Sequence, residues 1–255
     1  MADKIEDLLQ RRTDLSTFLI HLTRKTKNFD ARSNLLGILR EHAIIARTEL
    51  GMAQTYATQL DGTAATQRVV CFTETPLEHA WMMTREIENR QRSFAPYGVV
   101  FTKTTCRRRS CNPVWYLDIT PGHDWLTPPI NELVKMAVEN STVKKGQIDN
   151  GVLAAQPIFR LTPFIEQMGK PLEVRKEFWW EREWRHAGDF SFSPRSVVAV
   201  LAPRSEHGSL ETEIAALDER WKKRKVPLLD PEWGLERMIA ALARIDEDDA
   251  GPWPE

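Results

Sequence analysis

The chain has few cysteines and no long apolar segment, and each absence excludes a class of protein. Three cysteines among 255 residues are too few, and odd in number, for the disulfide framework of a small secreted protein. No apolar run approaches the roughly 20 residues that cross a bilayer. The first residues, Met-Ala-Asp-Lys-Ile-Glu-Asp, are too charged for a signal peptide. We therefore expect a cytoplasmic protein with no membrane partner.

The chain also has no excess of either charge. The 35 Lys and Arg residues oppose 36 Asp and Glu residues, which leaves a net charge of −1. No global field therefore attracts nucleic acid or an anionic membrane. A local basic cluster, Arg107 to Arg109, is expected in a loop between two strands, where such clusters are usually solvated. A nucleic-acid acceptor has no support beyond this loop.

A metal site is not expected either. Cys106 and Cys111 are separated by a four-residue gap, and His123 follows without a fourth ligand. Structural zinc sites use four ligands with a shorter first spacing. We predict no bound metal.

The order of predicted elements indicates an α+β fold. Apolar residues make up 42% of the chain and charged residues 28%, as in ordinary globular proteins. Strands and helices follow one another without regular βαβ alternation, which favours a mixed, mainly antiparallel sheet with flanking helices. We expect one domain over 1–245 and a disordered acidic tail over 246–255. Strands are predicted at 18–20, 68–74, 98–101, 113–117, 178–186 and 196–201, and helices at 31–40, 77–92, 128–145, 210–224 and 231–245.

Three of these helices have predicted N-caps. Asp30 precedes the helix at 31–40, and Asp230 precedes the last helix. Thr75, followed by Pro76 and then Glu78, has the sequence of a capping box with proline in the first turn. The amides at the start of this helix could also bind an anion, although a cap and water satisfy them more often.

The densest group of chemically active side chains lies in Phe178–His186, Phe-Trp-Trp-Glu-Arg-Glu-Trp-Arg-His. In a strand the side-chain period is two, so Glu181, Glu183 and Arg185 should share one face. Carboxylates beside indole rings are partly desolvated, which raises a pKa and strengthens any cation contact. Glu181 and Glu183 are therefore candidate catalytic residues. The alternative is a salt-bridged outer face, with Glu181 paired to Arg185.

The same alternation predicts the surroundings of the two acids. Trp180 and Trp184 should lie in the core, on a central strand of the sheet. Glu181 and Glu183 should then face a cleft. A helical conformation for this segment would contradict the prediction.

Earlier segments offer candidate binding residues. His21 and Thr23 alternate on one side of a strand and could hold a sugar hydroxyl or an amide, although a half-buried histidine bound to a backbone carbonyl is as common. Arg47, in a loop, is a candidate phosphate contact or a solvated side chain. Tyr97, next to Gly98, could stack on a ligand that approaches the backbone, or could be a core tyrosine.

Four motifs occur in one order: His21–Thr23, Cys71–Leu77, Tyr97–Phe101 and Glu181–Arg185. Together they resemble the AbiGi family of bacterial abortive-infection proteins, found in phage-resistance systems, over about 14–203. Members of that family have been labelled antitoxins. The same layout is similar to the wider ADP-ribosyltransferase superfamily, including DarT-like toxins that modify DNA.

The second resemblance implies a role for each candidate, with NAD as the substrate. His21 would hold a ribose of NAD with help from Thr23, and Tyr97 would lie against the nicotinamide ring. Glu183 would stabilise the positive charge that develops on the ribose as nicotinamide leaves. Glu181 would orient the acceptor.

Two function classes follow. The first is an NAD-dependent ADP-ribosyltransferase or NAD-cleaving enzyme. The second is a non-enzymatic defence component that neutralises a toxin or senses phage, in which the acid pair is structural and exposed Trp and Arg form an interface. The partner would be a cognate toxin, an antitoxin or a phage protein. Release of nicotinamide from NAD distinguishes the two.

Overall fold

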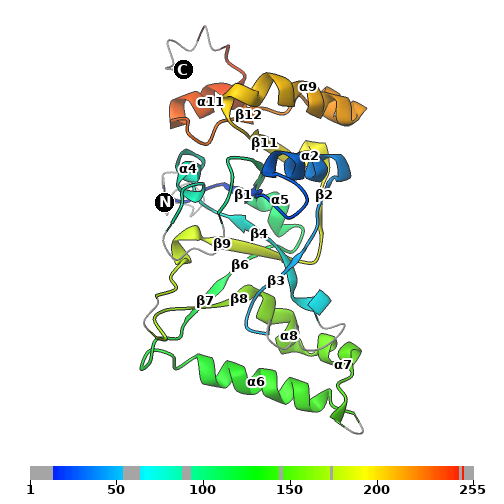
Figure 1. Cartoon of the computed structure of the whole chain (residues 1–255), viewed down its shortest axis with the longest axis vertical. Coiled ribbons are helices and arrows are strands. Elements are labelled where there is room, and N and C mark those ends of the chain that lie inside the picture. The colour runs from blue at the N-terminus through cyan, green and yellow to red at the C-terminus, as the bar shows by residue number, and fades with distance from the viewer. Residues whose placement is uncertain are drawn as a thin grey trace, which may run out of the picture. The chain divides into compact units, whose positions relative to one another are not determined.

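The computed structural model describes residues 14–53, 64–87, 93–143, 146–172, 175–246 and 249, and it confirms the predicted α+β class (Figure 1). The described residues fall into two compact units. Unit 1 lies within 1–43, 72–108 and 191–255, and unit 2 within 44–71 and 109–190. The two units are divided between residues 71 and 72, inside strand β4 (Arg68–Thr73), so this strand contributes to both units.

The sheet of unit 1 contains the strands that the sequence predicts most clearly. Its order is β12-β11-β5-β1-β4, with β1 antiparallel to both neighbours and β11 antiparallel to β5. Only β11 and β12 pair in parallel. The apolar side chains of β5 are fully buried, which accounts for its continuous hydrophobic sequence. Besides β4, the strands of this sheet are β1 (Phe18–Leu22), β5 (Gly98–Thr102), β11 (Val197–Leu201) and β12 (Leu228–Leu229).

Helices flank this sheet. The helix predicted at 31–40 is α2 (Ala31–Glu41), and the Asp30 carboxylate accepts a hydrogen bond from the Ser33 amide at 2.7 Å, as predicted for an N-cap. The other helical segments of unit 1 are short: η2 (Leu77–His79), α4 (Ala80–Met83), α5 (Lys103–Arg107), η6 (Pro194–Ser196), η7 (Arg204–Glu206), α9 (His207–Leu217), α10 (Glu219–Arg224) and α11 (Leu235–Ala243).

The prediction of one helix over 77–92 is wrong. The segment is a 3-10 turn followed by α4, which ends at Met83, and 88–92 lie outside the described residues. Thr75 does not cap it, because the Thr75 hydroxyl pairs with the Thr73 hydroxyl at 2.8 Å. At the other end, the Thr84 hydroxyl donates to the Trp81 carbonyl at 2.8 Å, a local bond that competes with helix continuation.

The predicted helix over 210–224 is two helices. Asp218 is extended, with φ −164°, and its carboxylate accepts from the amides of Arg220 at 2.7 Å and Trp221 at 2.9 Å. This cap starts α10 and thereby ends α9. The basic cluster at 107–109 is also not a simple loop between strands, since Arg107 closes helix α5. The last helix begins after Gly234 rather than at Asp230.

Unit 2 combines short strands with the longest helix. Strands β3 and β9 both neighbour β4. β3 is antiparallel to β4, β6 is antiparallel to β9, and β7 and β8 form a separate parallel pair. The strands are β3 (Thr48–Glu49), β6 (Asn112–Pro113), β7 (Trp115–Asp118), β8 (Ile165–Met168) and β9 (Glu183–Ala187). The helical segments are η1 (Ala64–Gln67), α6 (Thr127–Asn140), α7 (Asn150–Ala155), α8 (Pro157–Leu161), η4 (Thr162–Phe164) and η5 (Trp179–Glu181).

The core beside these helices is a small cluster made of Ala53, Val134, Ala137, Leu153 and Phe159. Two further short strands, β2 (Ala43–Ile44) and β10 (Phe190–Ser191), pair with each other.

The strand predicted at 178–186 is half as long as expected. Only β9 is extended, and it lies between β4 and β6 in the strand order, away from an edge. Trp179 to Glu181 form a 3-10 turn, and Arg182 has a left-handed φ of 48°, which interrupts the alternation. Trp184 is buried, as predicted, but Trp180 is only half-buried.

The described residues contain neither a membrane-spanning helix nor a candidate metal site. In the part of the chain that the structure describes, no helix is both long and apolar enough to cross a bilayer. The same residues contain no group of three or more His, Cys, Asp or Glu side chains that could hold a metal ion. Cys71, Cys106 and Cys111 form no disulfide bond. The acidic tail predicted as disordered lies outside the described residues except for Asp246 and Asp249.

Candidate functional site

Glu183 binds a buried arginine. The Arg185 side chain is 2% exposed, and its Nε and Nη2 atoms donate to the two carboxylate oxygens of Glu183 at 2.9 and 2.8 Å. Nη2 also donates to Glu166 at 2.8 Å, and Nη1 donates to the Pro163 carbonyl at 2.7 Å. Lys176 completes the group through Glu166 at 2.6 Å. We call Glu166, Lys176, Glu183 and Arg185 the Arg185 network.

Charge compensation holds this network together. Burial raises the pKa of Glu166, but the positive charges of Arg185 and Lys176 outweigh burial and keep that pKa below its ordinary value. Burial lowers the pKa of Arg185, and the surrounding groups, Glu183 first, raise it above its ordinary value. Glu166 and Arg185 are therefore charged at neutral pH. Two cations balance two anions, which is the pattern of a structural ion-pair network.

The structure separates the two predicted acids. Glu183 opens strand β9, whereas Glu181 lies in η5, on the other side of the left-handed Arg182. The Glu183 amide donates to the Tyr116 hydroxyl at 3.2 Å. Burial, and then the Glu183 charge, raise the pKa of Tyr116 above its ordinary value, so this hydroxyl stays neutral. The prediction that Glu181 and Glu183 stand side by side on one strand face is wrong. Arg185 pairs with Glu183 and Glu166.

Tyr97 belongs to a second network, in unit 1. Its hydroxyl donates to Glu206 at 2.6 Å, and the other oxygen of Glu206 accepts from Arg32 Nε at 2.8 Å. Arg32 also forms a forked pair with Glu213, at 2.7 and 3.2 Å. Burial, and then the hydrogen bond to Glu206, raise the pKa of Tyr97 to about 12. We call Arg32, Tyr97, Glu206 and Glu213 the Arg32 network.

Thr23 lies close to Tyr97 but faces the backbone. The Thr23 side chain is buried, and its hydroxyl lies 2.8 Å from the Ala31 carbonyl oxygen and 3.3 Å from that of Tyr97. The Thr23 amide also donates to the Tyr97 carbonyl at 2.8 Å. These bonds tie the end of β1 to the segment before β5. Thr23 therefore has a visible structural role.

The glycine after Tyr97 also serves the sheet. A Cβ atom added to Gly98 would lie 2.7 Å from the His21 carbonyl oxygen, well inside van der Waals contact. The sequence suggested that a ligand could approach the backbone at this glycine. In the structure, the backbone of strand β1 lies against it. The His21 ring is half-buried and meets Phe72 edge-on, with 5.8 Å between centroids.

The candidate residues are divided between the units. His21, Thr23 and Tyr97 lie in unit 1, whereas Arg47, Glu181 and Glu183 lie in unit 2. Arg47 is exposed. Within units, the structure brings Thr23 to Tyr97 and Glu183 to Arg185.

Unit 2 also exposes several large apolar side chains. On α6, Val134 and Ala137 are buried, but Leu133 and Met136 are 51% and 48% exposed. Leu126 and Pro129 precede them at helical spacing, so all four lie along one side of the helix, directly next to the buried side. The exposed tryptophans of unit 2 are Trp115, Trp125 and Trp179.

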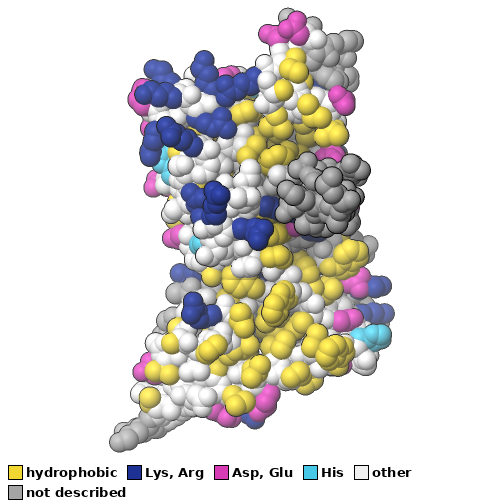
Figure 2. All heavy atoms as spheres, turned by 180° about the vertical axis from the view of Figure 1, so that it is seen from behind, with side chains coloured by type: hydrophobic (Ala, Val, Ile, Leu, Met, Phe, Trp, Pro, Cys, Tyr) yellow, Lys and Arg dark blue, Asp and Glu magenta, His cyan; other side chains and the backbone are white. Residues whose placement is uncertain are grey.

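Figure 2 shows hydrophobic side chains gathered over the part of the molecule in which Figure 1 labels α6, β7 and β8. The sequence contained a signal for this surface, because α6 has apolar residues at more positions than one buried stripe requires. We call Leu126, Pro129, Leu133 and Met136 the α6 stripe.

Comparison with known proteins assigns a family. Residues 49–205, more than half of the chain, match the family described as "Putative abortive phage resistance protein AbiGi, antitoxin". Neither a curated protein nor a solved structure matches the chain significantly. The matched range contains the Arg185 network, α6 and three of the four motifs, and it confirms the expected resemblance to this family. His21–Thr23 lies before the matched range. The chain belongs to the AbiGi family of abortive phage-resistance proteins.

Proposed function

We propose that this protein is the antitoxin of a phage-resistance system and that it binds its cognate toxin through the α6 stripe. The observation that carries the proposal is the exposure of Leu133 and Met136 next to the buried side of helix α6. Large apolar side chains that stay in water cost free energy. Because Leu133 and Met136 are about half exposed, a partner that covers them recovers about 0.8–1.5 kcal/mol for each side chain. Clustered exposed apolar residues commonly mark protein interfaces.

The family description supports the choice of partner, since an antitoxin acts on a toxin. The tryptophans of unit 2 support the same choice, because Trp is enriched among the residues that dominate binding energy. Trp125, one residue before the α6 stripe, is 75% exposed. We therefore expect it to contribute to the interface.

The proposal assigns Glu183 to the scaffold. Catalysis of NAD cleavage requires a carboxylate that can face the developing positive charge. Both oxygens of Glu183 already bind Arg185. NAD cleavage remains the competing prediction, with Glu181 and Glu183 as catalytic residues and His21, Thr23, Arg47 and Tyr97 as binding residues.

The experiment compares two double variants of α6 with equal changes in charge. Leu133→Glu with Met136→Glu adds two negative charges on the α6 stripe. Asn131→Glu with Lys135→Gln makes the same change in net charge on the solvated side of the helix, where both residues are exposed. Each variant is co-expressed with the toxin of the same resistance system.

We expect the stripe variant to lose toxin binding and protection from growth arrest, because two charges would have to be buried in the interface. Its melting temperature should match that of the control variant, which should bind and protect as the natural protein does. A folded stripe variant that still binds and protects would refute the proposal.

A further inference from the structure

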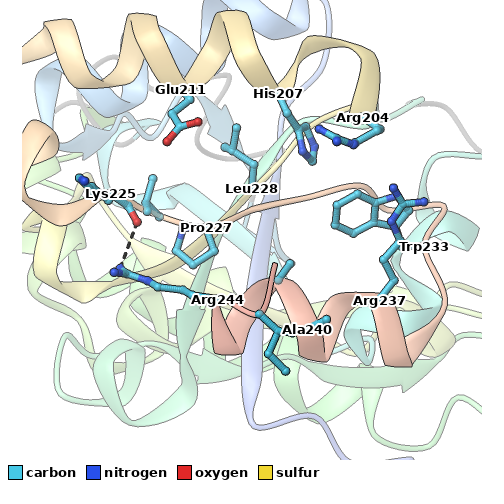
Figure 3. A pocket seen from close by; sticks show the side chains of 13 residues that line it. Arg204, His207, Glu211, Lys225, Pro227, Leu228, Trp233, Arg237, Ala240 and Arg244 are labelled. Carbon is cyan, nitrogen blue, oxygen red and sulfur yellow. Dashed lines mark hydrogen bonds between the residues drawn. The ribbon is translucent and has the colours of Figure 1, made fainter. Parts of the chain in front are cut away.

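Unit 1 contains a cavity of about 350 Å³ formed by its C-terminal segments (Figure 3). Its walls come from η7 and the start of α9, from the segment around β12, and from α11. The volume is within the range of ordinary small-molecule sites. None of the lining residues belongs to the networks or to the α6 stripe described above.

Positive charge dominates this cavity. Four cations line it, and Glu211 is the one acidic residue among the lining residues. Figure 3 shows Lys225 and Arg244 toward one end and Arg204 and Arg237 toward the other, with Pro227 and Leu228 between them. Because the whole chain carries a net charge of −1, this is a local concentration. We call Arg204, Lys225, Arg237 and Arg244, with the cavity they line, the cationic pocket.

Two of the cations are held in place. Arg244 Nη2 donates to the carbonyl oxygens of Arg224 and Lys225 at 3.3 and 3.1 Å, the second bond being drawn in Figure 3. Arg237 lies over the Trp233 ring, 4.4 Å from its centroid. Guanidinium groups fixed before binding lose less entropy when a ligand arrives.

Together with burial, the positive charge at the Arg244 end of the pocket lowers the pKa of a neighbouring arginine, Arg224. Burial lowers the pKa of Arg224, and the charge of Arg244 lowers it further. Like charges repel one another in this part of the structure, and an anion placed among them would relieve that repulsion.

Part of the pocket lining is apolar, and we call this part the apolar floor. Val226, Trp233 and Ala240 line it and are each at least nine-tenths buried. An apolar lining can accept an uncharged part of a ligand, while the lining cations fix the charged part.

We propose that the cationic pocket binds a phosphate-bearing small molecule, with its phosphates against the cations and an apolar or aromatic part over the floor. Arginine forks match the geometry of phosphate oxygens, and several cations around one cavity suit a group with more than one negative charge. The site is separate from the toxin contact proposed above.

Isothermal titration calorimetry on the full chain tests this with two probes, pyrophosphate and ADP. The matched variants are Lys225→Gln, which removes a lining cation, and Lys223→Gln, which removes the same charge two residues earlier, at an exposed position outside the pocket. Arg204→Gln tests the other end and keeps the backbone bond of residue 204 to Asp230.

We expect saturable binding with one site per chain, and ADP should bind more tightly than pyrophosphate because of the apolar floor. Lys225→Gln and Arg204→Gln should each weaken ADP binding by at least about tenfold, the value of one charged hydrogen bond. Lys223→Gln should stay within about twofold, because an exposed charge outside the site is screened.

Three results would overturn the proposal. They are no saturable binding of either probe at millimolar concentration, equal affinity for pyrophosphate and ADP, and equal weakening by Lys223→Gln and Lys225→Gln. Melting temperatures of the three variants without ligand verify that each is folded, so a loss of binding is attributable to the pocket.

Discussion

The Arg185 network and the Arg32 network have the same composition at their centres but different surroundings. In each, one arginine bridges two glutamates through forked hydrogen bonds. The Arg185 side chain is 2% exposed, whereas that of Arg32 is 26% exposed. Water screens the second network but hardly reaches the guanidinium at the centre of the first.

This difference determines what each network contributes. A buried ion that loses its partner keeps the full cost of desolvation, so the fold depends on Arg185 and on the two glutamates that bind it. An ion at the surface that loses its partner is resolvated, so the Arg32 network contributes little to stability. Each network contains a residue that the sequence presented as part of an NAD site, Glu183 in one and Tyr97 in the other.

The largest effect should follow from Arg185→Leu. The substitution leaves Glu166 and Glu183 facing each other without their shared cation, and we expect a loss of about 3–5 kcal/mol in the free energy of unfolding. Urea denaturation measures it. A loss below about 1 kcal/mol would mean that the network is not structural, and the distinction between buried and exposed networks would fail.

The sequence predicted local elements well because their causes are local. The Asp30 cap and the apolar runs of β1, β5 and β11 each depend on neighbouring residues, and all were found. Phe178–His186 was misjudged because period-two alternation was extended through Arg182, whose left-handed backbone restarts the pattern. Neither residue next to Arg182 is glycine, so no sequence signal predicted this turn.

The contacts of the site were less predictable. Glu183 and Arg185 are two residues apart on a strand, so their pairing was within reach of the sequence. Glu166 and the Pro163 carbonyl come from another segment, and a single sequence does not show which distant segments meet. The cationic pocket likewise brings together Arg204, Lys225 and Arg244 from three separate elements.

A smaller effect is expected for Glu183→Gln. The amide keeps the shape but leaves Arg185 with Glu166 as its single carboxylate, and we expect a loss of about 1–3 kcal/mol in unfolding free energy. Toxin neutralisation per folded molecule should not change. If stability were unchanged while function disappeared, Glu183 would be a functional residue and the assignment to the scaffold would be wrong.

Tyr97→Phe should cost less, about 1 kcal/mol, because the lost hydrogen bond to Glu206 is partly open to water. The pKa of Tyr97 is raised from 10.0 to about 12 in the fold. The neutral hydroxyl therefore contributes its stability fully below pH 10, and the contribution is lost as the pH rises through about 12.

Unfolding free energies measured between pH 9 and 12 test this sign. The difference between the natural protein and Tyr97→Phe should shrink toward the alkaline end. A constant difference over that range would show that the Tyr97 hydroxyl does not titrate as the Arg32 network requires.

The smallest effect should follow from Arg32→Gln, which removes the centre of the exposed network. We expect less than about 1 kcal/mol, and the loss should decrease further in high salt. The losses in unfolding free energy of Arg32→Gln and Arg185→Leu, measured under the same conditions, show how strongly burial changes what such a network contributes. A loss as large as that of Arg185→Leu would mean that burial is not what separates the two networks.

The most direct test of the central claim is release of nicotinamide from NAD by the purified full chain, measured beside Glu183→Gln. If the protein is a binding antitoxin with Glu183 in its scaffold, both samples should release nicotinamide no faster than buffer. Release by the natural protein that disappears in a folded Glu183→Gln variant would contradict the account and would assign an active site to Glu183.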